Sequence, residues 1–230
     1  MEAVYMKSVP YSNAVGSVMY SMMSTRPDIA YGLGLVSRFM SKPSREHWQA
    51  VKWLLRYLKG TSKLKLVYSS QAQSTCDIIG YCDSDFAADL DKRRSLSGYV
   101  FTFGGNVVSW KSSLQHVVAL STTEAEYISL TEAVKEPLWI KGFVGEIGFE
   151  QNYATIFCDL QSAIHLSKNA VFHEKTKHVD VRLHFVRDII TRQLVSVRKI
   201  DTKVNPADVL TKIIPVSKLK DALGLLKIQE

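Results

Sequence analysis

The stretch Asp77-Ile-Ile-Gly-Tyr-Cys-Asp-Ser-Asp85 is the part of the sequence that decides the fold. Residues 77–82 form a short, mainly apolar run of β-forming side chains, which predicts a strand buried on both faces. Asp83 follows at the predicted end of this strand. A carboxylate buried there costs free energy unless a metal, a cation or backbone donors compensate its charge. An aspartate at a strand end is also a common turn residue, so both roles stay open.

The composition, 46% hydrophobic and 22% charged in 230 residues, is that of a globular protein. No apolar run approaches the roughly 20 residues of a membrane-spanning helix, so we expect no membrane association. The N-terminus has no basic leader or long apolar core, which argues against a signal peptide. Cys76, Cys82 and Cys158 lack metal-ligand spacing and indicate reduced thiols. The expected location is therefore intracellular, in the cytoplasm or the nucleus.

The net charge of +7 lies in the first third of the chain. Residues 1–70 hold ten Lys or Arg but three Asp or Glu, whereas residues 71–230 hold nineteen of each. A basic segment joined to a neutral one with acidic clusters predicts that the first part binds a polyanion and the second processes it. A solvated basic face is the alternative.

The sequence pattern in the first third of the chain predicts helices. Residues 12–40 form two, divided by Thr25-Arg-Pro-Asp28, where Thr25 would cap the second and Pro27 would begin it. A third begins after Ser44 and ends at Gly60, with an apolar stripe and basic residues that include Lys52 and Arg56 facing out. The stripe is Trp48, Val51, Leu54, Leu55 and Leu58.

The aromatic residues Trp48, Trp53 and Tyr57 of that third helix are expected in the core, with base stacking as the alternative. A short strand and a polar linker occupy residues 61–75, so we place a domain boundary near residue 72.

Beyond residue 72 the pattern changes to strands and then alternates. The expected strands are 77–82, 95–103, 106–110, 155–158 and 195–200, with a hairpin turn at Gly104-Gly105. The expected helices are 121–136, continued or restarted after Pro137, then 160–167, 177–192 and 205–212. Three antiparallel strands followed by alternating helices and strands predict an α/β fold with a mixed five-stranded sheet and flanking helices.

Three later carboxylates each have a structural explanation of their own. Ser121-x-x-Glu124 is a capping box, which gives Glu124 a structural role and leaves Glu126, two residues on, without one. Both acids could also simply stabilise the N-terminus of the helix through its dipole. Asp159 could cap the helix after it, and Asp208 could be a favourable acid in the first turn after Asn205 and Pro206.

A shared position explains these acids better. Asp83 and Asp159 end two strands of one sheet, and the helices that begin at Ser121 and Asn205 can pack their first turns against that edge. Four converging carboxylates would repel one another unless hard cations lay between them. Mg²⁺ prefers oxygen ligands and phosphate substrates, and two such ions catalyse phosphodiester hydrolysis. We therefore expect two Mg²⁺ ions, or Mn²⁺ in their place.

Several motifs, in order, resemble the ribonuclease H domain of copia-type LTR retrotransposon Pol polyproteins. They are Gly80-Tyr-Cys-Asp-Ser-Asp-Phe-Ala-Ala-Asp89, Leu120-Ser-Thr-Thr-Glu-Ala-Glu-Tyr127, Cys158-Asp-Leu-Gln-Ser-Ala-Ile164, His173-Glu-Lys-Thr-Lys-His178 and Asn205-Pro-Ala-Asp-Val-Leu-Thr-Lys212. Upstream, Val9-Pro-Tyr-Ser-Asn-Ala-Val-Gly16, Thr25-Arg-Pro-Asp-Ile-Ala-Tyr31 and Leu55-Arg-Tyr-Leu-Lys-Gly-Thr61 resemble that family's connection between reverse transcriptase and ribonuclease H.

The resemblance implies that residues 1–72 are a helical, thumb-like remnant of the reverse transcriptase connection and residues 73–230 a ribonuclease H-like domain. It assigns Asp83, Glu126, Asp159 and Asp208 as the catalytic, metal-binding quartet. The chain departs from the family at Leu160 (usually Asn), Ala170 (often Pro), Leu114 (often Lys) and Pro137, inside a usually unbroken helix. The loop at Thr202-Lys-Val-Asn205 also lacks the histidine of cellular ribonucleases H.

A basic cluster follows the third motif. His173, Lys177 and His178 precede a helix with Arg182, and we interpret them as contacts to a nucleic-acid backbone, with surface packing as the alternative. They do not form a zinc site, because no cysteine pair accompanies them.

The sequence thus predicts a Mg²⁺-dependent endonuclease that cuts the RNA strand of an RNA–DNA hybrid within a retrotransposon polyprotein. No Tyr-x-Asp-Asp polymerase signature occurs, so the reverse transcriptase palm domain is an expected partner missing from this chain. The alternative is a catalytically silent or repurposed transposon fragment that binds nucleic acid or a host partner. A secreted effector is a third possibility, against which the missing signal peptide argues.

Overall fold

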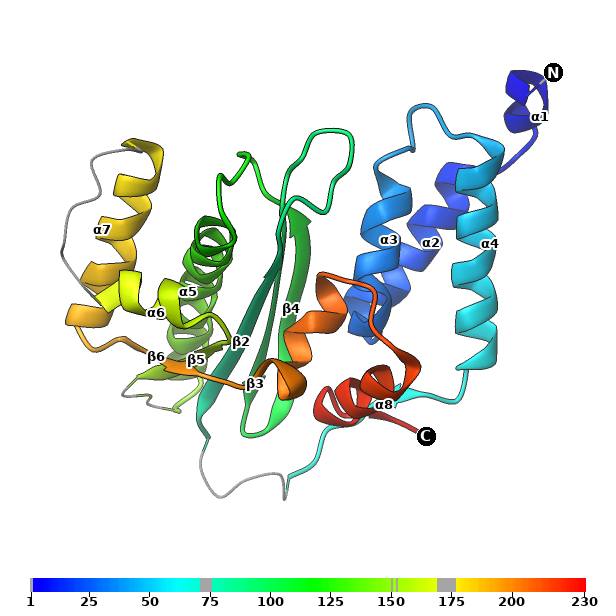
Figure 1. Ribbon diagram of the computed structural model, residues 1–230. Coiled ribbons are helices and arrows are strands. Elements are labelled where there is room, and N and C mark those ends of the chain that lie inside the picture. The colour runs from blue at the N-terminus through cyan, green and yellow to red at the C-terminus, as the bar shows by residue number, and fades with distance from the viewer. Residues whose placement is uncertain (1, 71–75, 150, 152, 169–176) are drawn as a thin grey trace.

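A five-stranded mixed sheet forms the centre of the computed structural model, which describes residues 2–70, 76–149, 151, 153–168 and 177–230 (Figure 1). The strand order is β4-β3-β2-β5-β6. The strands are β2 (Ile78–Asp85), β3 (Leu96–Phe103), β4 (Asn106–Leu114), β5 (Ala154–Cys158) and β6 (Val195–Lys199). β2 lies antiparallel to β3 and parallel to β5. The predicted α/β fold with a mixed five-stranded sheet is therefore confirmed.

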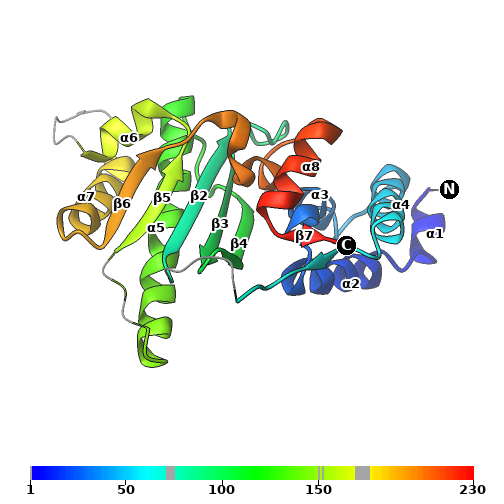
Figure 2. The same ribbon diagram turned by 90° about the horizontal axis from the view of Figure 1, so that it is seen from below.

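Three helices cover one face of the sheet, as Figure 2 shows from below. They are α5 (Thr122–Glu146), α6 (Gln161–Lys168) and α7 (Lys177–Thr191). Inward-facing side chains of β2, β3, β5 and β6 pack against them, with Phe101, Tyr127, Leu130 and Ile156 among the fully buried residues. This layer is the main core of the molecule.

The opposite face is covered by segments from both ends of the chain (Figures 1 and 2). The C-terminal ones are the 3₁₀-helices η2 (Thr202–Val204) and η3 (Pro206–Leu210) and the helix α8 (Val216–Leu225). From the N-terminal part, α2 (Tyr11–Ser24), η1 (Pro27–Ile29) and α3 (Ala30–Ser37) lie beside β4 and η3. Helices α1 (Glu2–Lys7) and α4 (Arg45–Gly60) lie farther from the sheet. Ala30 belongs to the same apolar cluster as Val100 and Leu210, so the N-terminal helices are packed onto the sheet.

A small second sheet also joins the two ends of the chain. β1 (Lys65–Leu66) pairs antiparallel with β7 (Ile228–Gln229). The indole Nε1 of Trp110 in β4 donates to the carbonyl oxygen of Met22 in α2 at 3.2 Å. The division into domains at residue 72 stays a prediction, and contacts of this kind cross it.

Several local predictions differ from the structure. Thr25 ends α2 rather than capping the next helix, because its backbone N–H continues the helical pattern to Ser21. Of the two possibilities expected after Pro137, the structure shows the continued helix: α5 runs through Pro137, and Ile140 and Val144 beyond it are buried. Leu55 is exposed, unlike the rest of its predicted stripe.

The exposure of the aromatic residues in α4 also differs in part from the prediction. Trp48 and Tyr57 are partly buried, and both pack against the core of the N-terminal helices. Trp53 is 61% exposed. Trp53 was therefore wrongly expected in the core.

The C-terminal segments show the largest departures. Residues 206–210 form a 3₁₀-helix, shorter than the helix expected over 205–212, because the chain leaves it at Thr211 and turns that side chain toward Asp83. Helix α8 and strand β7 were not anticipated. Among the described residues, every helix is too short or too polar to cross a bilayer.

Gly98 in β3 provides a test of how η3 is held. It pairs with Asp83, and a Cβ at this position would lie 2.8 Å from the Cβ of Leu210 and 2.7 Å from the Cγ2 of Thr211. We expect Gly98→Ala to lower the free energy of unfolding by about 1–3 kcal/mol, as overpacking does. Denaturant-induced unfolding measures this change.

Gly142→Ala is the matched control. Gly142 is exposed in α5, and a Cβ at this position would have no neighbouring atom within 4 Å. Alanine should therefore leave stability unchanged or raise it by up to about 1 kcal/mol. Equal effects of the two substitutions would contradict the tight approach of η3 to the sheet.

Candidate metal centre

The register of β2 and β5 brings Asp83 and Asp159 together. The parallel pairing of these strands ends at Cys82 and Cys158, so the two aspartates are the next residues on neighbouring strands. Asp83 was expected to end its strand, but it does not, because pairing of β2 with β3 continues to Asp85. The Asp83 residue is 1% exposed, whereas Asp159 is partly exposed.

Asp208 is positioned by a side-chain bridge from Asn205. The Asn205 Oδ1 accepts from the backbone N–H of Ala207 at 3.1 Å, which caps η3 as predicted. The Asn205 Nδ2 donates to the carbonyl oxygen of Cys82 at 3.0 Å. One asparagine thereby fixes the start of η3 against Cys82, the last residue of β2 that pairs with β5. The Asp208 residue is 1% exposed.

Glu126 reaches the same place from the first turns of α5. Its Oε1 accepts from the backbone N–H of Ser84 at 3.0 Å. The Ser129 hydroxyl, one turn later, donates to the carbonyl oxygen of Asp83 at 2.7 Å. These two bonds tie α5 to β2 and place the Glu126 carboxylate beside the aspartates.

Glu124 has the separate structural role predicted for it, with a different partner. The Ser121 hydroxyl accepts from the Glu124 N–H at 3.1 Å. The Glu124 Oε2 accepts from the N–H of Leu120 at 2.7 Å, one residue before the cap.

All four predicted carboxylates therefore converge at one end of the sheet. Ligand atoms of Asp83, Asp159 and Asp208 lie within 4.8 Å of one another. Those of Glu126, Cys158 and Asp159 form a second group within the same limit. Asp159 belongs to both groups and so links them.

Two lysines and a threonine contact these acids and were not identified as site residues from the sequence. The Lys212 Nζ lies 3.2 Å from the Asp83 Oδ1 and 3.1 Å from the Asp208 Oδ1. Lys218 forms an ion pair with the Asp208 Oδ2, and the Thr211 hydroxyl donates to the Asp83 Oδ2. The spacing of Asp208 and Lys212, four residues apart, was the available signal for the first contact. Lys218 lies on the unanticipated helix α8.

The ionisation of the site shows that its negative charge is incompletely compensated. Burial, with the nearby charges of Asp83 and Asp159, raises the pKa of Glu126 to about 10. Burial also raises the pKa of Asp83 to about 7, although Lys212 opposes the shift. For Lys212, burial favours the neutral amine, but Asp83 and Asp208 outweigh it and raise its pKa.

These residues fit a hard divalent cation. The four carboxylates supply only oxygen ligands, which Mg²⁺ prefers. Within the described part of the chain, the buried Oε2 of Glu126 has no hydrogen-bond partner, so it is available as a ligand. A bound cation would also stabilise the charged forms of Asp83 and Glu126, whose pKa values are raised without it.

Two of the positions that depart from the family lie near this centre. Leu160 follows Asp159, packs partly buried against the main core and accepts a 3.9 Å contact from the Cys158 thiol through its carbonyl oxygen. Leu114 is the last residue of β4 and pairs with Leu96. Ala170 lies outside the described residues.

The predicted nucleic-acid contacts lie in two separate places. His173 is outside the described residues. Lys177 and His178 are the first two residues of α7, and the structure describes only their backbone. Arg182 in α7 is partly buried. Lys52 and Arg56 lie on α4, on the far side of the sheet from α7 (Figures 1 and 2). The structure therefore does not bring the two groups together.

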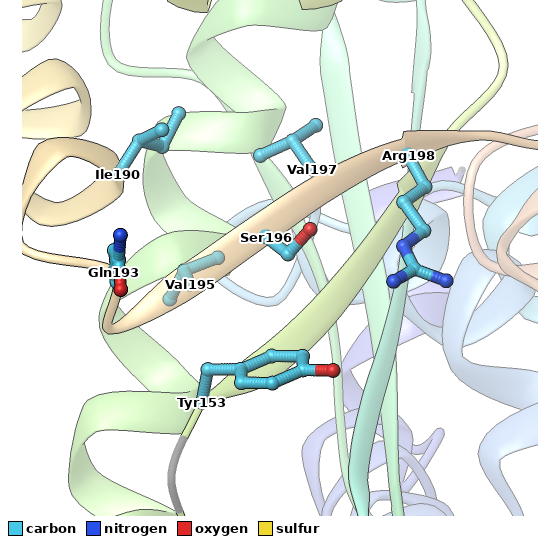
Figure 3. Close-up of a pocket in the computed structure, with 7 residues that line it drawn as sticks. All are labelled: Tyr153, Ile190, Gln193, Val195, Ser196, Val197 and Arg198. Carbon is cyan, nitrogen blue, oxygen red and sulfur yellow. The ribbon is translucent and has the colours of Figure 1, made fainter.

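A groove along the edge strand β6 lies apart from the carboxylates. Figure 3 shows Tyr153 and Ile190 beside the strand, with Arg198 at its far end. None of the residues that line this groove is an acid. The acidic centre, rather than this groove, holds the groups that could bind a metal ion.

No protein-family model matches the chain, but individual proteins do. It is 52% identical over 223 residues to the retrovirus-related Pol polyprotein from transposon TNT 1-94 of Nicotiana tabacum, covering 96% of the chain and 17% of the polyprotein. It is 37% identical over 209 residues to the polyprotein from transposon RE1 of Arabidopsis thaliana, covering 90% and 14%. The chain thus spans less than a fifth of these polyproteins.

A shorter relative is matched over most of its length. The secreted RxLR effector protein 161 of Plasmopara viticola is 48% identical over 135 residues, which cover 59% of the chain and 94% of the effector. Similarity to an effector and similarity to transposon polyproteins therefore occur in one chain.

Solved structures similar to the chain include ribonucleases H. RNase H1 from Halobacterium salinarum is 17% identical and covers 59% of the chain and 94% of its own, with a TM-score of 0.43. LC11-RNase H1, solved in complex with an RNA/DNA hybrid, is 18% identical with the same coverage and a TM-score of 0.44. The sequence relatives decide the family. The chain belongs to the copia-type, retrovirus-related Pol polyproteins of transposons, of which it represents one segment.

Proposed function

We propose that this chain is a divalent-metal-dependent ribonuclease H that hydrolyses the RNA strand of RNA–DNA hybrids within a transposon Pol polyprotein. The observation that carries the proposal is the convergence of four carboxylates from four separate elements at one end of the sheet. The sequence relatives support it, because they are retrovirus-related Pol polyproteins from transposons.

Asp83, Glu126, Asp159 and Asp208 would hold the metal. Two Mg²⁺ ions in such a site supply an activated water and stabilise the leaving oxygen of a phosphodiester. The protein's part is to hold the ligands in place: Ser84 orients Glu126, Asn205 positions η3 with Asp208, and the sheet register places the other two acids.

Recognition of the hybrid would fall to the basic residues. An RNA–DNA hybrid has a wide, shallow minor groove in which 2′-hydroxyls identify the RNA strand. We assign phosphate contacts to His173, to Lys177, His178 and Arg182 of α7, and to Lys52 and Arg56 of α4. A duplex that reached both groups would have to extend past the acidic centre between them.

One observation favours a second candidate, a catalytically silent fragment that binds nucleic acid. Lys212 and Lys218 pair with Asp83 and Asp208, so two of the four acids have cationic partners without any metal. Such a protein would fold and bind hybrids without cleaving them.

Cleavage of a labelled RNA–DNA hybrid in Mg²⁺, with and without a chelator, separates the two candidates. We expect wild-type protein to cut the RNA strand only without chelator. Glu126→Gln keeps the shape but removes a charged ligand, so the cleavage rate should fall by orders of magnitude while hybrid binding persists. Glu124→Gln is the matched control, because glutamine can still accept from the Leu120 N–H, and it should retain most of the activity.

Truncation of the same residue, Glu124→Ala, should cost on the order of 1 kcal/mol of stability with little loss of rate per folded molecule. If Glu124→Gln abolished cleavage while Glu126→Gln spared it, the metal ligand would be misassigned. Hybrid binding without any cleavage by the wild type would select the silent fragment.

The pH dependence of stability tests the buried charges without substrate. Folding raises the pKa of Glu126 from 4.5 to about 10 and that of Asp83 from 3.8 to about 7. The folded state therefore keeps protons that the unfolded state releases. In chelator, the free energy of unfolding should fall as pH rises from about 4 to 7, by up to about 1.4 kcal/mol per pH unit for each group.

Between pH 7 and 10 the fall should continue through Glu126 alone. Mg²⁺ should raise stability by more as pH rises, and so flatten the profile, since it binds the charged acids. Denaturant titrations at several pH values measure this, and Glu126→Gln should flatten the profile without metal. A profile that rises with pH in chelator would rule out uncompensated acids in the folded state.

The salt dependence of hybrid affinity tests the basic face of α4. Lys52 and Arg56 lie one turn apart, and deleting residues 1–70 is a poor test because those helices share a core with the sheet. Lys52→Gln/Arg56→Gln should reduce the slope of log affinity against log salt by up to about 2. Lys111→Gln/Lys135→Gln, which removes two cations near Glu132, is the matched control and should leave the slope unchanged. Equal slopes in the wild type and both double variants would show that α4 does not contact the hybrid.

A further inference from the structure

A cysteine thiol lies beside the carboxylates. Cys158 is the last residue of β5 and is fully buried, and its side chain belongs to the core between the sheet and α5. Its sulfur lies within 4.8 Å of a carboxylate oxygen of Glu126 and of Asp159. The nuclease chemistry proposed above uses the two acids but not the thiol.

A second observation points to a ligand in this cluster. Glu126 is 7% exposed, and its Oε1 already accepts from Ser84. Its Oε2 is buried and has no hydrogen-bond partner among the residues that the structure describes. A buried acceptor without a partner, next to a thiol, is available as a ligand to a cation. Asp159, which is partly exposed, forms the open side through which an ion can enter.

The donor set distinguishes two classes of ion. Mg²⁺ binds oxygen ligands and has little affinity for sulfur, whereas Zn²⁺ binds thiolate and carboxylate together. Three protein ligands and an open position are the arrangement of zinc sites that keep a place for water or another group.

We propose that Glu126, Cys158 and Asp159 form a site for a thiophilic divalent cation, Zn²⁺ in the cell, which shares two carboxylates with the Mg²⁺ centre and therefore competes with it. The site itself stands on the geometry of these three residues. Its inhibitory consequence rests on the proposed ribonuclease function. When the ion binds, the Cys158 proton is released to solvent and sulfur becomes a ligand.

The other two cysteines provide controls. Cys82 pairs with Cys158 across the strands, and the two thiols contact each other. The Cys82 thiol donates to the carbonyl oxygen of Phe157 at 3.6 Å and is not one of the three clustered ligands. Cys76 is exposed. Each can be replaced by serine without removing a proposed ligand.

Titration of the chelator-stripped protein with CdCl₂ tests the site, because a thiolate bound to Cd²⁺ gives an ultraviolet charge-transfer absorption that Mg²⁺ does not. We expect the absorption to saturate at one equivalent in the wild type, Cys76→Ser and Cys82→Ser. It should be lost in Cys158→Ser, and ZnCl₂ should abolish it in the wild type. An unchanged absorption in Cys158→Ser, or its loss in Cys76→Ser, would overturn the inference.

Glu126→Gln keeps every thiol and covers the case in which Cys158→Ser does not fold, which circular dichroism would reveal. Losing one of three ligands should weaken Cd²⁺ binding by about 100-fold or more, because loss of an outer hydrogen bond alone costs a metal site about 10–100-fold. Undiminished affinity in this variant would also overturn the proposal.

Cleavage assays separate the site from the proposed function. In an active enzyme at fixed Mg²⁺, ZnCl₂ should inhibit, and Cys158→Ser should raise the half-inhibiting concentration by about tenfold or more relative to its own uninhibited rate. Wild-type protein that cleaves hybrids but gives no charge-transfer absorption would overturn the cation site and leave the nuclease. Wild-type protein that gives the absorption but does not cleave hybrids would overturn the nuclease and leave the cation site.

Discussion

The structure depends on the burial of the Asp83 carboxylate, which lies on the central strand β2 at one end of the sheet. Asp83 is 1% exposed, and a charge in such a place destabilises the fold unless other groups compensate it. Thr211 donates to one carboxylate oxygen and Lys212 contacts the other. Both residues follow η3 directly, so the contacts that compensate the Asp83 charge also fix the position of the C-terminal segment.

The position of η3 in turn requires close contact with the sheet. Asn205 bridges from the start of η3 to the carbonyl oxygen of Cys82, and Gly98 leaves the space into which Leu210 and Thr211 fit. The Ser112 hydroxyl donates to the carbonyl oxygen of Leu210 at 2.6 Å, which holds the other end. These contacts explain how a five-residue 3₁₀-helix can hold the buried Asp208 in place without a long helix behind it.

The N-terminal helices are part of the same arrangement. Ala30, Val100 and Leu210 share one apolar cluster, and β1 pairs with β7 next to it. The second face of the sheet is therefore covered jointly by the two ends of the chain. A basic segment held in this way is oriented relative to the acidic centre, which a flexible linker would not achieve.

The sequence by itself determined the strands, most helices and the four acids, because these depend on local patterns. The β-forming run 77–82, the Gly104-Gly105 turn and the Asn205-Pro206 cap are signals within a few residues, and each is found in the structure. The tertiary structure decided which groups compensate the acids. Lys218 and Thr211 reach Asp208 and Asp83 through helix packing and a turn, and no local spacing reports such contacts. It also decided that Cys158 lies against Glu126, since only the pairing of β5 with β2 and the packing of α5 join these distant residues.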